Sequence, residues 1–390
     1  MINHTPGAGR PVGSAPHPTA PHIVVGPRAN ACYTGLMPTG TDGLAADLLS
    51  PRLTTGEGPG AYDRLLVALR ALRDDPALLT PLSRAWVSRS FSGVFARPTL
   101  LLAALRYRAL SVDDHPLAPE VLLDGEAPEL DRRLREALAD PELVAVLAAR
   151  AVRSHDPGRA LGWGLATLAL GLPHRRFALV DMAAVAGLHL VVDLTSVPLR
   201  LGAEKITGLD LPSPHLRRGL DADPVDVHVE ADVRWLRAGI WPGQPDRADR
   251  FEAALEALRR PWRGSSPGPT LARHRLGADD TAAVLTAAGA DPDVDAVIAF
   301  ETAATPADPD AHRDALTGWL LEGPGRLWVT FDPAPPGPTG SGGGPMSLVA
   351  HTAHGGEVAP IELARAAYHP AGCVIVPGAI QALRARWSSP

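Results

Sequence analysis

The segment Phe177–Asp193, FALVDMAAVAGLHLVVD, decides the fold of this chain. It has the pattern of a buried strand, a turn and the start of a helix, with an acid, Asp181, at the end of the strand. This is the layout of the first strand–helix unit of a nucleotide-binding α/β sheet. Such a turn holds glycines so that backbone N–H groups can approach the ligand. Here Met182–Gly187 keeps one glycine, Gly187, so the segment predicts the frame of a cofactor site without its usual lining.

The composition limits the class of protein. The chain has 390 residues, 45% of them hydrophobic, which is enough for one large or two ordinary domains. A net charge of −6 argues against a nucleic-acid partner. Two cysteines, Cys32 and Cys373, cannot form a disulfide framework or a zinc site by themselves, and we expect no metal. There is no membrane-spanning apolar run and no signal-peptide pattern, so we expect a cytoplasmic protein that does not bind membranes.

The chain divides into three parts by pattern. Residues 1–55 are rich in Pro, Gly, Thr and His and are expected to form a flexible N-terminal arm. Residues 56–170 carry apolar side chains at helical spacing and predict a helical region. Residues 171–390 alternate strands with helices, which favours a mostly parallel, Rossmann-like α/β domain. The Pro- and Gly-rich loop at 333–345 is either a lid or an inert insertion, and it could order on a partner subunit, as could the arm.

The expected elements follow from these patterns. Strands are expected at Phe177–Asp181, Thr270–Leu276, Val294–Glu301, Arg326–Asp332, Ser347–Thr352 and Gly372–Val376. Helices are expected at Tyr62–Arg73, after Asp75-Pro76, at Pro98–Leu110, within Glu129–Ala151, and at Asp232–Ile240, Asp249–Arg260 and Ala311–Leu321.

One candidate catalytic residue lies directly after a predicted strand. Glu301 ends the apolar run VDAVIAFE. Ligands of open α/β sheets bind outside the carboxyl ends of the strands, so a carboxylate there is well placed for catalysis. His189, on the apolar side of the turn, is more simply explained as a core histidine with its hydrogen bonds satisfied. The motifs HExxH, Walker A and CxxC are absent from the sequence.

Three further clusters hold residues that could carry chemistry. Asp113-Asp114-His115 follows a buried helix and could bind an ammonium group or act as a base, although a capping turn explains it nearly as well. Arg153, His155 and Arg159 surround a Pro-Gly turn and fit an oxyanion, while a helix cap by Ser154 or Asp156 is the structural alternative. The third cluster either lines the ligand cleft or anchors a helix on the sheet through its tryptophans. Its members are Asp223, Asp226, Trp235, Arg237 and Trp241.

From residue 60 onward the chain resembles a bacterial family called domain of unknown function 2332. The matching segments are DDHPLAPE (113–120), RSHDPGR (153–159), LVDMAAVAGLHLVVD (179–193) and DADPVDVHVEADVRWLRAGIWP (221–242). The last is the most specific, because its spacing of Asp, Trp, Arg and Trp-Pro recurs whole in the family. The resemblance implies a class I methyltransferase-type core behind a helical region, with S-adenosylmethionine as the cofactor.

Only part of the family motif is present in this chain. Its acid falls at Asp181 and its last glycine at Gly187, and these are the cofactor-binding residues if the site is retained. Ala183 and Val185 stand where the family has glycine and serine. We therefore expect no tight binding of S-adenosylmethionine. Three interpretations stay open: an enzyme that uses the cleft for another reaction, a methyltransferase acting on a small molecule, and a scaffold subunit.

The first interpretation suggests a natural-product enzyme that needs no cofactor. Its chemistry would be similar to that of the aziridine-forming enzymes of azinomycin-type pathways, in which an amine displaces a neighbouring sulfate. Glu301 and Asp113 would then orient and deprotonate the ammonium of a small-molecule substrate. Arg153, Arg159 and Arg237 would hold the anion that departs.

Overall fold

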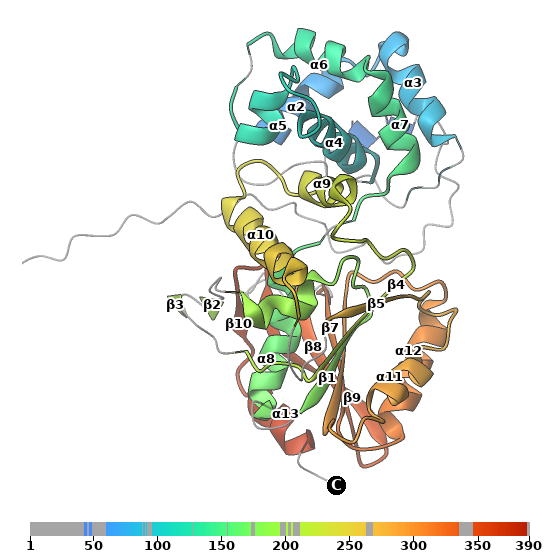
Figure 1. Cartoon of the computed structure of the whole chain (residues 1–390), viewed down its shortest axis with the longest axis vertical. Helices are drawn as coiled ribbons and strands as arrows, with labels where there is room; N and C mark the ends of the chain where they lie inside the picture. The colour runs from blue at the N-terminus through green and yellow to red at the C-terminus, as the bar shows by residue number, and fades with distance from the viewer. Residues whose placement is uncertain are drawn as a thin grey trace, which may run out of the picture.

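The protein is described here from a computed structural model (Figure 1). The described residues are 43–44, 47–48 and 60–387, with gaps at 88, 90, 92–95, 127, 154, 173–175, 196–199, 202–203, 206–210, 263–267 and 335–345. Nearly all of the predicted N-terminal arm and most of the Pro- and Gly-rich loop lie outside the described residues. No helix in the described part of the chain is long and apolar enough to cross a membrane.

The helices fall into an N-terminal set and a set that alternates with strands. The first set comprises α2 (Ala61–Ala71), α3 (Pro76–Trp86), α4 (Ala96–Ala109), α5 (Ala118–Leu123), α6 (Leu130–Leu138) and α7 (Pro141–Ala149). The second comprises η1 (Pro157–Ala160), α8 (Leu161–Leu170), η3 (Leu188–Leu194), α9 (Glu230–Ala238), α10 (Pro245–Arg259), α11 (Thr281–Ala288), α12 (Pro309–Leu321) and α13 (Ala379–Trp387).

The described strands form one sheet in the order β3-β2-β10-β9-β8-β7-β6-β1-β4-β5. Their bounds are β1 (Phe177–Asp181), β2 (Arg200–Leu201), β3 (Glu204–Lys205), β4 (Leu216–Asp221), β5 (Thr270–Arg273), β6 (Ala296–Thr302), β7 (Arg326–Pro333), β8 (Met346–His354), β9 (Glu357–Ala366) and β10 (Gly372–Ile375). The half from β5 to β7 is parallel throughout, whereas β8, β9 and β10 join it as antiparallel strands. The expected mostly parallel α/β sheet behind a helical region is confirmed.

The direction of the chain reverses beside β1. Strands β4 and β5 lie on one side of β1, and β6 and β7 lie on the other, with Val180 paired to Arg218 and to Ala299. This is the switch point of a doubly wound sheet, where ligands bind outside the carboxyl ends. The ends of β1 and β6, with Asp181 and Glu301, therefore mark the place to search for a site.

Four helices begin at an Asp-Pro pair, and each start has the same physical cause. Asp75, Asp140, Asp156 and Asp308 each accept a hydrogen bond from a backbone N–H in the first turn. The proline that follows lacks an N–H that would otherwise have no partner, and its fixed φ suits the first turn. The sequence alone predicts the first of these starts, at Asp75.

Strand β4, LRRGLD, was not expected, because its charges hide the apolar pattern. Arg217 is buried and donates to both carboxylate oxygens of Asp193, each at 2.6 Å. Strand β9 was also not expected, since its sequence EVAPIELARA mixes Pro and charged residues with small ones. The helix expected after the β1 turn is a short 3-10 helix, η3.

Helices cover both faces of the sheet (Figure 1). One face packs against α8 and α13, and the other packs against α11 and α12. The N-terminal helices form a separate core that also takes in Trp235 and Ala238 of α9 and the partly buried Trp241. Helix α9 follows the carboxyl end of β4, so the helical region lies over the carboxyl edge of the sheet (Figure 1).

Candidate functional site

The turn after β1 uses its backbone N–H groups within the protein. The N–H of Met182 donates to Phe300 O, that of Ala183 to the Asp181 carboxylate, and that of Ala184 to Leu220 O. The N–H of Val185 donates to Asp221 Oδ2 at 3.0 Å. A nucleotide-cradling turn instead directs such groups at its ligand.

The space beside the retained glycine is also occupied. Gly187 has φ +79°, in the left-handed region that favours glycine. A side chain there would meet the methyl groups of Leu271 and Leu190 at 3.3 and 3.4 Å. The close approach that glycine permits is therefore used by Leu271 of the edge strand β5.

Asp221, at the end of β4, is an acid that sequence reasoning missed. Its Oδ1 accepts a hydrogen bond from Arg153 at 2.9 Å and another from the N–H of Asp223 at 2.8 Å. Arg153 also reaches Asp223, whose carboxylate pairs with Arg273. Both carboxylate oxygens of Asp221 are thus occupied, and Arg153 forms ion pairs at this edge.

A buried polar cluster lies at the same edge around Asp156, which is fully buried. Arg250 donates to both Asp156 oxygens at 3.3 and 3.2 Å, and Arg247 lies 3.8 Å from Oδ2. His369 Nδ1 lies 3.2 Å from Asp156 Oδ2 and donates to it, because a carboxylate oxygen can only accept. Burial lowers the pKa of His369 to about 3 and leaves the ring neutral. Burial would raise the pKa of Asp156, but these partners outweigh it and hold that pKa well below its ordinary range.

The acid at the end of β1 belongs to this cluster. His189 Nδ1 lies 2.9 Å from Asp181 Oδ2, and its Nε2 lies 3.1 Å from the carbonyl oxygen of Asp156. The Asp181 carboxylate can only accept, so Nδ1 of His189 donates to it. The expectation of a buried histidine with satisfied hydrogen bonds is confirmed. The Asp181 carboxylate is bound by His189, which is buried in the protein core.

Two buried nitrogens of the cluster have no hydrogen-bond partner. They are Nε2 of His155 and Nε of Arg247. The His155 ring lies 4.4 Å from the His189 ring, and burial together with the charges of His189 and Arg159 holds the pKa of His155 well below its ordinary range. Buried polar atoms without partners are uncommon and call for an explanation, of which a bound polar ligand is one.

Glu301 and Asp332 form a carboxylate pair at the ends of β6 and β7. Glu301 accepts a hydrogen bond from His312 of α12 at 2.8 Å. Burial, and then the negative charge of Glu301, raise the pKa of Asp332 to about 6, while the charge of Arg159 opposes that shift. Arg159 is 1% exposed, and its guanidinium lies 4.2 Å from the centre of the Tyr368 ring. Arg159 is therefore close enough to interact electrostatically with both Asp332 and His155.

The predicted base of the helical region does not join this site. Asp113 and Asp114 are exposed in the turn after α4, where Asp114 has φ +59°. His115 is buried and accepts the N–H of Leu117 at 3.2 Å, so it stabilises the turn. Glu301 is buried in the sheet against α12, so the structure does not bring it together with Asp113.

The other predicted residues near the cleft serve packing or surface ion pairs. Arg237 donates to Glu252 with two nitrogens, at 2.6 and 2.9 Å, and to Glu230 at 2.9 Å. Trp235 donates to Ala151 O at 2.9 Å, which anchors α9. Trp241 packs on Tyr62, with ring centroids 5.0 Å apart. The helix-anchor interpretation therefore fits Trp235 and Trp241.

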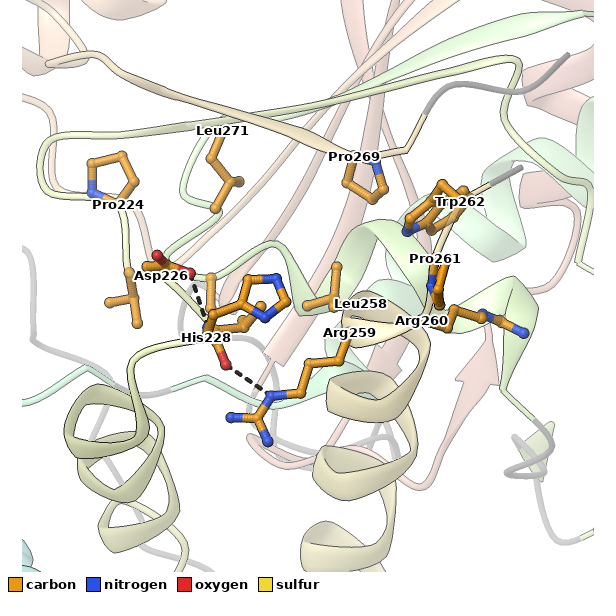
Figure 2. Close-up of a pocket in the computed structure, with 13 residues that line it drawn as sticks. Pro224, Asp226, His228, Leu258, Arg259, Arg260, Pro261, Trp262, Pro269 and Leu271 are labelled. Carbon is orange, nitrogen blue, oxygen red and sulfur yellow. Dashed lines mark hydrogen bonds between the residues drawn. The ribbon is translucent and has the colours of Figure 1, made fainter. Parts of the chain in front are cut away.

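Asp226 lines a separate cavity of about 600 Å³ between the C-terminal end of α10 and the edge strand β5 (Figure 2). Ala186 of the β1 turn forms part of its lining. The buried cluster does not line this cavity, so the cavity and the groups with perturbed pKa values lie at different places.

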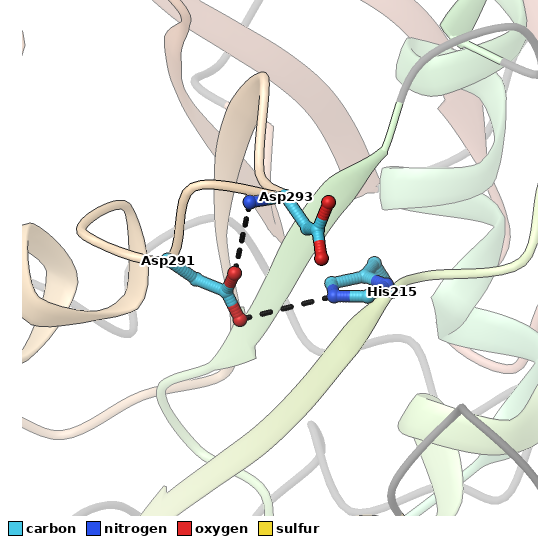
Figure 3. A group of neighbouring side chains, drawn as sticks. All are labelled: His215, Asp291 and Asp293. Carbon is cyan, nitrogen blue, oxygen red and sulfur yellow. Dashed lines mark hydrogen bonds and ion pairs between the residues drawn. The ribbon is translucent and has the colours of Figure 1, made fainter.

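A third group lies at the opposite, amino-terminal edge of the sheet. His215, Asp291 and Asp293 place potential metal ligands within 4.8 Å of one another (Figure 3). Arg176 forms an ion pair with Asp293, however, and His215 lies 3.8 Å from Asp291. These pairs account for the grouping without an ion.

Several residues of the buried cluster around Asp156 were not predicted from the sequence. Arg247 and Arg250 are three residues apart on α10, and His369 and Asp332 come from late segments. Only Asp156 carried a signal, because it lies between His155 and Arg159 in a segment already chosen. Asp221 could have been recognised as an acid at the end of a strand, but strand β4 was itself not predicted.

Comparison with known proteins identifies the family. No curated protein and no solved structure gives a significant match to the chain. A family model described as an uncharacterized protein conserved in bacteria, DUF2332, matches residues 61–372, which span the helical region and nearly all of the sheet. The chain therefore belongs to the DUF2332 family.

Proposed function

We propose that this protein is a cytoplasmic natural-product enzyme that acts without S-adenosylmethionine. Its substrate would be a small molecule that carries both an amine and a sulfate or phosphate ester. The reaction would close an aziridine ring by intramolecular displacement of the ester. A small partner protein could assist, with the enzyme chemistry residing in this chain.

The observation that carries the proposal is the position of Arg159. Its charge acts on Asp332, which neighbours Glu301, and on His155. Arg159 can therefore hold a departing anion close to Glu301 and Asp332, which can take a proton. Nε2 of His155, which has no hydrogen-bond partner, offers a further contact for an oxyanion, whereas Nε of Arg247 already lies 3.8 Å from Asp156 Oδ2.

The proposed step balances as follows. A carboxylate of the Glu301–Asp332 pair takes a proton from the substrate ammonium, and the freed amine attacks the carbon that bears the ester. The C–N bond forms, the C–O bond breaks, and sulfate leaves with the bonding electron pair, while the aziridinium that results gives its extra proton to solvent. An Asp332 pKa of about 6 suits a base that works near neutral pH. Arg159 stabilises the charge that develops on the leaving oxygen.

A methyltransferase is the second candidate. The switch point beside β1, with Asp181 and Asp221 at two strand ends and Gly187 in the turn, favours it. The occupied N–H groups of the turn and the packing of Leu271 over Gly187 argue against it. Calorimetric titration with S-adenosylmethionine distinguishes the two, since a micromolar dissociation constant would restore the methyltransferase.

The test of the main proposal is turnover of 2-aminoethyl hydrogen sulfate, a minimal substrate of this chemical class. Sulfate release would be followed by ion chromatography and aziridine formation by NMR. We expect release with the wild-type protein and a loss of at least about 100-fold for Glu301→Gln or Asp332→Asn, the usual size of a general-base contribution. Asp249→Asn, an exposed change on α10, is the charge-matched control.

Two outcomes would count against the enzyme. Equal rates for Glu301→Gln, Asp332→Asn and Asp249→Asn would remove the carboxylates from the mechanism. A folded protein without turnover, whose Arg159→Lys and Glu301→Gln variants support normal product formation in the producing cell, would establish a scaffold.

A further inference from the structure

The cavity beside β5 lies apart from the buried cluster (Figure 2). Arg250, which contacts Asp156, and Leu258, which lines the cavity, are both on α10. Their eight-residue separation corresponds to about 12 Å along a helix axis. A ligand in this cavity would therefore occupy a site that the proposed reaction does not use.

The walls of the cavity are mainly apolar and incompletely covered. Leu258, Pro261, Trp262 and Pro269 line it together with Leu271, which stays 36% exposed. In Figure 2 the Trp262 ring and Pro269 stand on one side and Pro224 and Asp226 on the other, with the His228 ring between them. A volume of about 600 Å³ falls within the range of small-molecule sites.

One carboxylate of the lining, that of the exposed Asp226, has an oxygen without a hydrogen bond among the described residues. Asp226 Oδ1 accepts the N–H of His228 at 2.8 Å, and Oδ2 has no hydrogen bond among the described residues. Both arginines of the lining already donate hydrogen bonds. Arg259 donates to Val227 O at 2.8 Å and to Glu230 at 3.2 Å, and Arg260 donates to Leu194 O at 3.4 Å.

From these features we infer that the cavity binds a small molecule with a flat, mainly apolar ring system and one hydrogen-bond donor. The ring packs between Trp262, Leu258 and Leu271, and the donor reaches Asp226 Oδ2. Aromatic and aliphatic walls favour a flat apolar ring, and the carboxylate selects for the donor. The inference does not depend on the proposed reaction.

The test uses indole and 1-methylindole, which differ mainly in the presence of the N–H donor. Binding to the full chain would be measured by ligand-observed saturation-transfer NMR with concentration series. We expect indole to bind at least about tenfold more tightly than 1-methylindole, because a hydrogen bond to a carboxylate is among the stronger ones. Asp226→Asn should reduce indole binding by a similar factor, and Trp262→Leu should reduce the binding of both probes.

The control is Asp249→Asn, which removes the same charge from the exposed side of α10 and should leave indole binding unchanged. Thermal unfolding establishes that each variant is folded. The inference is overturned if indole shows no saturable binding, or if indole and 1-methylindole bind equally. It is also overturned if Asp226→Asn behaves like the control.

Discussion

At the scale of single residues, Asp156 connects parts of the chain that are far apart in sequence. It caps η1 and binds Arg250 of α10 and His369 of the segment before β10. Because these partners are buried, loss of the charge leaves guanidinium groups without an anion. The same residue therefore holds the fold together and shapes the electrostatics of the site.

We expect Asp156→Asn to lower the free energy of unfolding by about 3–5 kcal/mol, the usual cost of breaking a buried pair. Asparagine retains the shape and can still cap η1, so the change isolates the charge. Urea unfolding measures the effect, with Asp249→Asn as the exposed control, expected within about 0.5 kcal/mol of the wild type. Equal stability of the two variants would contradict the role given to Asp156.

Asp332 gives a prediction with a defined sign. Its pKa is raised from 3.8 to about 6 in the folded protein, so the folded state keeps a proton that the unfolded state has lost. Stability therefore falls as pH rises from about 4 to about 6, by at most about 3 kcal/mol from this residue. In Asp332→Asn this fall should be missing. The measurement is the difference in unfolding free energy between the variant and the wild type across this range. A difference that stays constant with pH would refute the prediction, and contributions from buried histidines cancel in the comparison.

At the scale of elements, α8 lies close to the sheet because it carries glycine. A side chain at Gly162 would meet Phe300 at 2.7 Å and Leu348 at 3.0 Å. Gly318 of α12 faces open space, with nothing within 4 Å. Two glycines in two helices thus have different reasons to be present, which the sequence does not reveal.

The two glycines should respond to alanine with opposite signs. Gly162→Ala should destabilise the protein by about 1–3 kcal/mol through overpacking. Gly318→Ala should stabilise it by about 0.5–1 kcal/mol, because alanine favours the helix interior. Chemical denaturation of both variants gives the answer, and a shift of the same sign in both would contradict the packing described for α8.

At the scale of the whole molecule, the helical region and the sheet share an element. Helix α9 follows β4, yet Trp235 and Ala238 lie in the core of the N-terminal helices. Trp235 packs edge-on against Tyr107 of α4, with ring centroids 5.7 Å apart. Helix α9 thus joins the two regions, because it follows a strand of the sheet in sequence and packs in the core of the N-terminal helices.

Trp235→Ala should therefore cost about 3–5 kcal/mol, as large-to-small changes in a core do. Amide exchange should quicken in α4 as well as in α9, because both helices lose the same contact. The exposed Val229→Ala is the control and should leave both rates unchanged. If exchange quickens in α9 alone, the two regions are not coupled through Trp235.

The sequence by itself determined the class of the fold and the location of its first strand. The spacing of apolar residues and the Asp75-Pro76 start are local features, so β1, β6, β7 and most helices follow from them. Strand β4 did not, because the pairing of Arg217 with Asp193 is a tertiary contact that lets a charged residue lie inside a sheet.

The site divides in the same way. Glu301, Asp181, His155 and Arg159 were each placed by a local signal, such as an acid at a strand end or a charged turn. Only the tertiary structure separated Asp113 from Glu301 and joined Arg159 to Asp332 and Asp156 to His369. Asp156 and His369 are 213 residues apart, and no local pattern carries information over that separation. Their proximity results from the order of the strands, which brings the segment before β10 to the edge of the sheet where η1, with its cap Asp156, packs on η3 after β1.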